Sequence, residues 1–265
     1  MINRRTFNST LDYTITNAIL PLNTKNQLNI DVGTFSYHSL SIDEMIERLQ
    51  KQRITEIEMS RGEFMLMKPP TPQMCESVRA KLDRAGIRCV SYYTATIKTD
   101  EDLDYAVRYA KIFGAGNVSG DATGGILQRI DERFTRERLT FGIHNHWFPK
   151  KFAYETVDDV LGGISGRSHA IGSTLDVGQM AACGQDPVDA VIRLGPYLKV
   201  VHLKDVEAAG AEHNVLLGQG IARIPEVMLA LKKIGFKGLV AIEYEKEGDV
   251  DQDMQMEIEY ARKRA

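Results

Sequence analysis

Acidic residues and a histidine stand where apolar, strand-like runs of this sequence end. The three clearest cases are Leu175-Asp176-Val177, Val201-His202-Leu203 and Ile242-Glu243-Tyr244. Burying an ionisable side chain without a partner costs several kcal/mol, so each of these groups needs one. A single shared cation would serve all of them.

His144 ends a further apolar run and completes a set of two imidazoles and two carboxylates. That donor set suits a divalent metal ion, and its nitrogen donors favour Mn²⁺, Co²⁺ or Zn²⁺ over Mg²⁺. The predicted metal ligands are therefore His144, Asp176, His202 and Glu243. Structural roles are the alternative, because Asp176 could cap the helix that follows it and Lys204 could simply pair with Asp205.

The elements that must position these groups follow one repeating pattern. From residue 29 onward, β-rich runs alternate with segments of helical periodicity, which is typical of a parallel sheet with crossover helices. The expected strands cover residues 29–35, 54–59, 87–92, 116–119, 139–145, 170–175, 197–203 and 238–244. They predict a single α/β domain, a (β/α)8 TIM barrel over residues 29–265. A doubly wound open sheet is the alternative, but no glycine-rich fingerprint follows the first strand.

Capping signals mark several of the intervening helices. Ser41 and Glu44 form an S-x-x-E capping box, and Thr71-Pro72 is an N-cap residue followed by proline at the first helical position. The inner face of the helix after Thr71 is expected to carry Met74, Val78 and Leu82. The helical signal is weakest between residues 121 and 138.

The histidines are distributed as an active site in a barrel would require. Active-site groups in such barrels come from the C-terminal ends of strands and the loops that follow. Of the six histidines, only His169 precedes an expected strand. The others lie at or beyond strand ends: His38, His144, His146, His202 and His213.

Composition limits the classes of partner. The chain is 43% hydrophobic and carries a net charge of −3 with scattered basic residues, so no basic footprint for nucleic acid is present. No run approaches the roughly 20 apolar residues of a membrane span. A small-molecule partner is expected, with a homo-oligomer left open. Cys75, Cys89 and Cys183 form no CxxC pair and are expected to act as buried hydrophobes.

Residues 1–28 are expected to form an extension that precedes the barrel. Arg4-Arg5-Thr6-Phe7 looks like a twin-arginine export signal. Asp12 and a run of Ser, Thr and Asn interrupt the apolar region that such a signal needs. The expected location is the cytoplasm, or the periplasm if this segment functions as a signal.

Three segments resemble the sugar phosphate isomerase/epimerase family of xylose isomerase-like barrels. The resemblance covers nearly the whole chain after about residue 29, and it implies a metal-binding Asp176, a His202 ligand followed by a glycine-rich turn, and a Glu243 that is both ligand and catalytic group. The segments are Thr174-Leu175-Asp176-Val177-Gly178-Gln179 continued by Gly184-Gln185-Asp186-Pro187, Val201-His202-Leu203-Lys204-Asp205 with Leu217-Gly218-Gln219-Gly220, and Ala241-Ile242-Glu243-Tyr244-Glu245.

The chain departs from this family at two positions. The family usually ends its fifth strand with Glu in an E-N-H sequence, whereas this chain has His144-Asn145-His146. That Glu is one of the two acid/base residues of the ketose epimerases, so the resemblance supports the metal site more strongly than the reaction. Gln179 likewise stands where many members carry His.

The expected function is that of a metal-dependent isomerase or epimerase. It would act through an enediolate on a sugar or sugar-derived hydroxy-carbonyl compound, with the metal chelating the carbonyl and a neighbouring hydroxyl. Glu243 is the predicted base, and Lys204 or His146 would return the proton. The predicted substrate contacts are Glu58, Trp147, Gln179 and His213. No lysine-rich or glycine-rich phosphate cradle is visible, which favours a non-phosphorylated substrate.

Three other functions are alternatives to this one. If no second group can reprotonate the carbon, loss of a β-hydroxyl would make the protein a dehydratase or another lyase on a keto-sugar or cyclitol. If the Glu-to-His change abolishes turnover, the protein would be a sugar-binding protein. The DNA repair endonuclease of this fold is disfavoured, because it needs several zinc ions and a basic groove.

Overall fold

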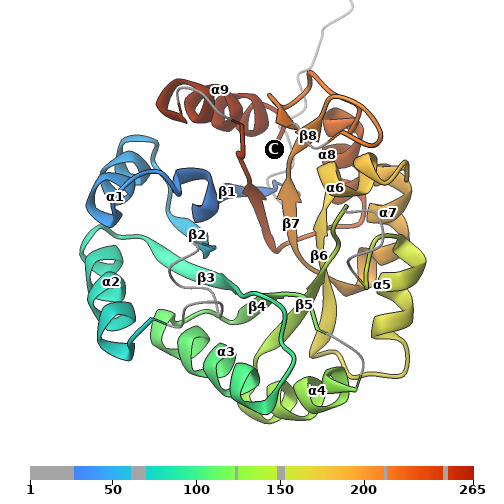
Figure 1. Ribbon diagram of the computed structural model, residues 1–265. Helices are drawn as coiled ribbons and strands as arrows, with labels where there is room; N and C mark the ends of the chain where they lie inside the picture. The colour runs from blue at the N-terminus through green and yellow to red at the C-terminus, as the bar shows by residue number, and fades with distance from the viewer. Residues whose placement is uncertain (1–26, 61–69, 123–124, 148–152, 212–213, 247–249) are drawn as a thin grey trace, which may run out of the picture.

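Eight parallel strands close into a barrel, and helices surround it (Figure 1). The computed structural model describes residues 27–60, 70–122, 125–147, 153–211, 214–246 and 250–265. The strands of the barrel are β1 (Asn29–Gly33), β2 (Glu56–Met59), β3 (Arg88–Tyr93), β4 (Asn117–Gly120), β5 (Thr140–His144), β6 (Ile171–Asp176), β7 (Leu198–Leu203) and β10 (Leu239–Ile242). Their order, β1-β10-β7-β6-β5-β4-β3-β2, follows the sequence around a closed ring. The predicted (β/α)8 barrel is confirmed, and the open sheet is excluded.

The helices pack their apolar faces against the outside of the barrel. They are α1 (Ile42–Lys51), α2 (Pro72–Arg84), α3 (Asp100–Phe113), α4 (Ile126–Glu137), α5 (Val157–Ile164), α6 (Val177–Ala182), α7 (Pro187–Leu194), α8 (Ile224–Lys233) and α9 (Val250–Arg262). Two short 3₁₀ helices, η2 (Thr34–Tyr37) and η4 (Gly195–Tyr197), complete the set among the described residues.

The predicted helix starts of α1 and α2 are confirmed, but one buried position was wrong. Ser41 and Glu44 form both hydrogen bonds of the capping box, and the Thr71 hydroxyl accepts from the Met74 N–H at 3.3 Å. The Met74 side chain, however, is 48% exposed. Cys75 takes the inner position instead, since the buried face of α2 follows the spacing Cys75, Val78 and Leu82.

A loop after β7 contains a short antiparallel pair that the sequence patterns did not predict, β8 (Asp205–Val206) with β9 (Asn214–Val215). Asp205 organises it. The Asp205 carboxylate accepts hydrogen bonds from the backbone N–H groups of Gly218, Gly220 and Ala222 at 2.9–3.0 Å. Gly220 is required here, because a Cβ would lie 2.1 Å from the Val206 carbonyl oxygen. Asp205 therefore does not pair with Lys204.

Two cysteines, Cys75 and Cys89, are buried as expected, whereas Cys183 is half-buried. Within the described ranges, no helix combines the length and apolar character that a membrane crossing requires. The predicted extension and its twin-arginine-like motif lie outside the described residues, apart from the last two residues before β1.

Glu257 is a buried carboxyl group on α9, only 4% exposed. Burial, together with repulsion from Asp253 and Asp205, raises its pKa to about 8, even though the Leu217 N–H donates to Oε1 at 3.3 Å. The folded protein therefore prefers the protonated form of this side chain.

A Glu257→Gln variant is expected to be more stable than the wild type at pH 9 and equally stable at pH 4. The raised pKa contributes stability that is complete below the unfolded value of 4.5 and is lost as the pH rises through about 8. The loss amounts to roughly 3–5 kcal/mol, or about 10 °C in Tm. Thermal melts from pH 4 to 9 measure it. Glu259→Gln on the exposed face of α9 is the control, and an equal pH response in both variants would contradict the assignment.

Candidate metal centre

Four side chains of metal-binding type converge at the C-terminal end of the barrel. One ligand atom from each of His144, Asp176, His202 and Glu243 lies within 4.8 Å of all the others, and all four residues are buried. They lie at or next to the ends of four neighbouring strands. Asp176 ends β6 and pairs with His202 of β7, and Glu243 follows directly after β10, in which Ala241 pairs with His202. His144 ends β5, which pairs with β6. The structure thus brings together the four predicted ligands.

The spacing of the donor atoms fits one ion. His144 Nε2 lies 3.1 Å from His202 Nδ1 and 3.8 Å from Asp176 Oδ2, and His202 Nδ1 lies 3.4 Å from Glu243 Oε2. Donors bound at about 2.0–2.2 Å to a tetrahedral or octahedral ion lie about 2.8–3.6 Å apart when they are neighbours and about 4.0–4.4 Å apart when they are opposite in an octahedron, so small side-chain movements would bring the four donors onto one ion. Burial, helped by His146 and His202, holds the pKa of His144 well below its usual value, so its imidazole is neutral and able to ligate.

The two carboxylate oxygens of Asp176 are placed for the two roles considered for it. Oδ1 caps α6 by accepting the Gln179 N–H at 2.9 Å. Oδ2 is buried and accepts no hydrogen bond from any described residue, although the Lys204 ammonium lies 3.2 Å away. A buried carboxylate oxygen without a hydrogen bond needs a nearby cation, and a metal ion held by the four residues would supply one in addition to Lys204.

Asn145 fixes the end of β5 against the end of β6. Its side-chain amide donates to the Asp176 carbonyl at 3.0 Å and accepts the Asp176 N–H at 2.9 Å. The two ligands that flank this contact, His144 and Asp176, are therefore held at a set separation by a fully buried residue.

Lys204 places a buried ammonium group beside the cluster. Nζ lies 3.2 Å from Asp176 Oδ2, 3.0 Å from Glu243 Oε2 and 2.8 Å from Glu245 Oε1. Burial opposes the charges, but the carboxylates raise the pKa of Lys204 well above its usual value, and Lys204 and His202 hold the pKa of Glu243 well below its own. Both groups are therefore charged at neutral pH.

His146 lies on the other side of the site, with two partners that sequence reasoning missed. Its Nε2 is 3.2 Å from Asp121 Oδ2, 3.3 Å from the Tyr93 hydroxyl and 3.0 Å from His144 Nδ1. Tyr93 ends β3 and Asp121 follows β4, so the rule that found the histidines could have found both. Neither residue fits the narrower pattern of a histidine, or an acid flanked by large apolar residues, at a strand end.

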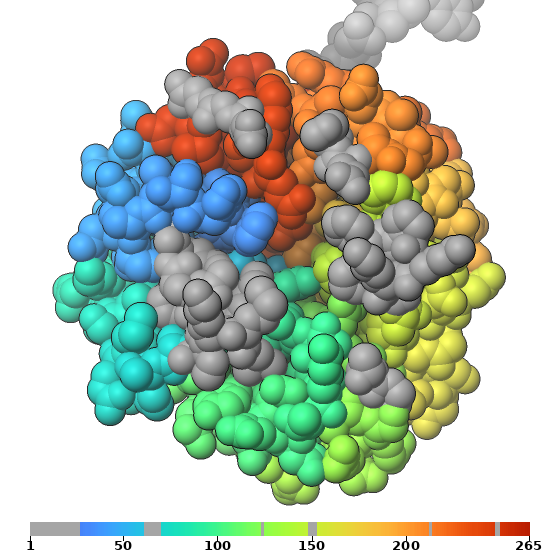
Figure 2. Space-filling view, viewed as in Figure 1, coloured from blue at the N-terminus to red at the C-terminus, as the bar shows by residue number. Residues whose placement is uncertain are grey.

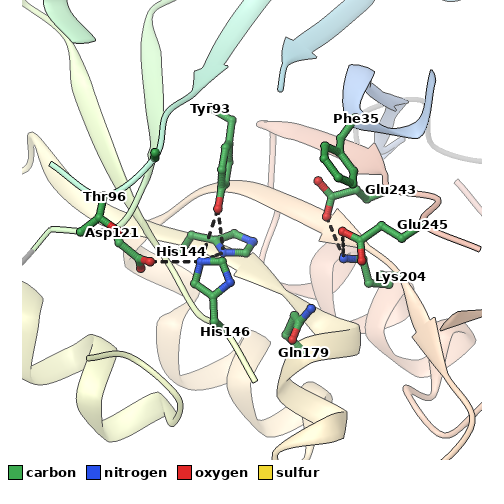
Figure 3. Close-up of a pocket in the computed structure, with 11 residues that line it drawn as sticks. Phe35, Tyr93, Thr96, Asp121, His144, His146, Gln179, Lys204, Glu243 and Glu245 are labelled. Carbon is green, nitrogen blue, oxygen red and sulfur yellow. Dashed lines mark hydrogen bonds and ion pairs between the residues drawn. The ribbon is translucent and has the colours of Figure 1, made fainter. Parts of the chain in front are cut away.

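A cavity of about 280 Å³ opens over these groups, at the lower end of the range for small-molecule sites. Figure 2 shows the hollow at the centre of this face of the barrel. Figure 3 places Asp121 and His146 on one side of it and Glu243, Lys204 and Glu245 on the other. Its described lining comprises Phe35, Tyr93, Ala95, Thr96, Asp121, His144, His146, Gln179, Lys204, Glu243 and Glu245.

The four residues predicted to contact substrate lie in different places. Gln179 lines the cavity, and its Oε1 accepts the Trp147 N–H at 2.8 Å. Trp147 is half-buried and packs against the core rather than among the lining residues. Glu58 is fully buried inside the barrel, where it contacts His202. His213 lies outside the described residues.

Residues 125–264, just over half of the chain, match the xylose isomerase-like TIM barrel family. The chain therefore belongs to this family. No curated protein matches the chain in sequence.

Solved structures of similar fold extend over most of the chain. D-allulose 3-epimerase from Methylomonas sp. has a TM-score of 0.73 at 16% identity, covering 90% of this chain and 98% of that one. The probable 3-DHS dehydratase AsbF from Bacillus anthracis has a TM-score of 0.70 at 15% identity, covering 87% and 97%. The IOLI protein, solved with a zinc atom, has a TM-score of 0.69 at 14% identity, covering 89% and 95%. At these identities the likeness shows the fold alone.

Proposed function

We propose that this protein is a divalent-metal-dependent isomerase or epimerase of a sugar or sugar-derived hydroxy-carbonyl compound. The observation that carries the proposal is the convergence of His144, Asp176, His202 and Glu243 beside a cavity that has a second ionisable pair, His146 and Asp121, on its opposite side. An isomerase or epimerase needs proton transfer at two positions or two faces, and this cavity offers a group on each side.

The four-residue cluster would hold Mn²⁺, Co²⁺ or Zn²⁺ more readily than Mg²⁺, because two of its donors are imidazole nitrogens. When bound, the ion supplies Lewis-acid stabilisation of the negative charge that develops on the substrate oxygens. Glu243 accepts the proton from the carbon next to the carbonyl, since its carboxylate is ionised and lines the cavity. The electron pair of the broken C–H bond passes into the enediolate.

His146 is the better candidate to return the proton. Lys204 also lines the cavity, but three carboxylates hold its ammonium in the charged form, which makes it a poor acid. The Asp121 carboxylate lies 3.2 Å from His146 Nε2 and orients the ring, as an acid orients the histidine of a hydrolase triad. Proton delivery to the neighbouring carbon gives isomerisation, and delivery to the opposite face of the same carbon gives epimerisation.

A His146→Gln variant is expected to lose about 10²–10⁴-fold in turnover, because it lacks the acid that completes the reaction. Its metal affinity should stay within about tenfold of the wild type, since His146 contacts His144 at Nδ1, whereas His144 Nε2 is the nitrogen that faces the cluster. Kinetic assays of ketose conversion and metal titration measure the two quantities separately. His169→Gln, an exposed histidine outside the cavity lining, is the control. Wild-type turnover by His146→Gln would remove His146 from the mechanism.

The function itself is tested by metal titration of the purified protein and by proton exchange with a panel of non-phosphorylated ketoses in deuterated water. We expect one divalent ion per chain and metal-dependent deuterium incorporation next to the carbonyl of at least one ketose. A protein that binds no metal would refute the proposal. A metal-loaded protein that binds a sugar without exchange would be a binding protein.

A lyase is the second candidate. The specific observation in its favour is His144, which stands where the ketose epimerases have an acid/base Glu. The four clustered residues therefore contain two carboxylates, Asp176, which caps α6, and Glu243, which is left as their one carboxylate base. Release of water with formation of an unsaturated product in the same assay would assign this reaction.

A further inference from the structure

Glu58 is an acidic side chain inside the barrel, fully buried next to the four-residue cluster and absent from the described cavity lining. It is the third residue of β2, and three groups contact its carboxylate. Oε1 accepts hydrogen bonds from the hydroxyls of Ser91 and Ser119, both at 2.6 Å. Oε2 lies 2.5 Å from His202 Nε2.

The hydroxyl groups that hold Glu58 are themselves fixed. The Asn117 amide donates to Ser91 Oγ at 3.0 Å and to Ser119 Oγ at 3.1 Å, so both hydroxyls are free to direct their protons at Glu58. Asn117 Oδ1 in turn accepts from the Thr140 hydroxyl at 2.7 Å. Strands β3, β4 and β5 thus contribute to a polar network in the barrel interior that leaves Oε2 directed at His202.

The direction of this contact determines which nitrogen of His202 is available to a metal. A carboxylate only accepts hydrogen bonds, so the ring nitrogen that faces Glu58, Nε2, is the one that carries hydrogen. A neutral imidazole then has its lone pair on Nδ1. Nδ1 is also the atom that faces the cluster, at 3.1 Å from His144 Nε2 and 3.4 Å from Glu243 Oε2.

We propose that Glu58 is a positioning residue that fixes the tautomer and ring orientation of His202, so that Nδ1 is the metal ligand. The inference rests on the proposed metal site, but it concerns a residue for which the sequence predicted substrate contact. Carboxylates that hold ligand histidines in this way typically change metal affinity by 10- to 100-fold.

Two measurements on the full-length protein test the role of Glu58. Competition with a fluorescent zinc chelator gives the zinc affinity of the wild type, Glu58→Gln and Asp31→Asn. The control, Asp31→Asn, also removes a buried carboxylate, one that binds Thr55, Glu56 and Arg262. Long-range ¹H–¹⁵N NMR of the zinc-loaded wild type, with His202 assigned from the spectrum of His202→Gln, reads the tautomer directly and does not depend on whether Glu58→Gln folds.

We expect hydrogen on Nε2 of His202, a 10- to 100-fold loss of zinc affinity in Glu58→Gln and less than a threefold change in Asp31→Asn. Hydrogen on Nδ1 would overturn the inference, as would equal affinities of the two variants, while leaving the proposed function intact. A wild-type protein that binds no zinc, manganese or cobalt would overturn the inference and the proposed function together.

Discussion

The Asp176→Asn variant is expected to lose divalent-metal affinity by at least about 100-fold and metal-dependent turnover by about 10³-fold, while keeping its fold. Asparagine retains an oxygen that can cap α6 by accepting the Gln179 N–H. At the position of Oδ2, the buried oxygen without a hydrogen bond, asparagine places either its NH₂ group or a neutral oxygen, and neither carries a negative charge. The cluster therefore loses one charged group, and Lys204 loses one of its three carboxylate partners, whereas the helix cap is kept.

A matched substitution separates the two roles of Asp176. Asp186 caps α7 by accepting the Val188 N–H at 2.9 Å and lies outside the cluster, so Asp186→Asn alters a cap without altering the site. Isothermal titration with Mn²⁺ or Zn²⁺ and melting curves with and without metal measure affinity and fold. If Asp176→Asn bound metal like the wild type, the cluster would be no metal centre. If both variants lost stability equally, capping alone would explain Asp176.

The sequence could predict the barrel and the four clustered residues because both depend on local signals. Alternation of strand-like and helix-like periods identifies each unit, and the closed order of the strands follows from the number of units. Asp176, His202 and Glu243 end apolar strands, and in a barrel all such ends meet at one face. Position along the chain was therefore enough to place their side chains together.

Partnerships between strands could not be predicted in the same way. Glu58 contacts His202 across 144 residues, and His146 contacts Asp121 from a different strand end. Such pairs depend on the register of the strands and on which face of each strand points into the barrel. Neither can be derived from the order of residue types along the chain. The prediction that Met74 is buried was wrong for a related reason. The face of α2 that packs against the barrel contains Cys75, one residue further along the helix.

Lys204 neutralises two of the carboxylates that the proposed metal ion would also neutralise. The ammonium group lies within 3.2 Å of Asp176 Oδ2 and within 3.0 Å of Glu243 Oε2, which are also the carboxylate oxygens that face the imidazoles. Gly178 makes room for it, since a Cβ there would lie 2.8 Å from Lys204 Cγ. In the metal-free protein, Lys204 is therefore a positive charge that compensates the buried carboxylates of Asp176 and Glu243.

A Lys204→Met variant is accordingly expected to be strongly destabilised without metal and largely restored with it. Removing one partner of a buried ion pair typically costs 3–5 kcal/mol, which corresponds to roughly 10 °C in Tm for a chain of this size. Metal would compensate the same carboxylates, so Lys204→Met is expected to bind it more tightly than the wild type; binding at 100 times Kd stabilises a protein by about 2.7 kcal/mol. The metal-induced rise in Tm should therefore be larger in Lys204→Met than in the wild type.

Lys199→Met is the control for this experiment, because Lys199 lies on the same strand but, among the described residues, donates only to the His169 carbonyl, at 2.9 Å. Its loss should cost about 1 kcal/mol and leave the metal-induced rise in Tm at the wild-type value. Equal rises in all three proteins would mean that Lys204 does not compensate the metal ligands. A larger rise confined to Lys204→Met would show that ammonium and metal stabilise the same two carboxylates, so that the ammonium group can stand in for the metal charge while the protein folds.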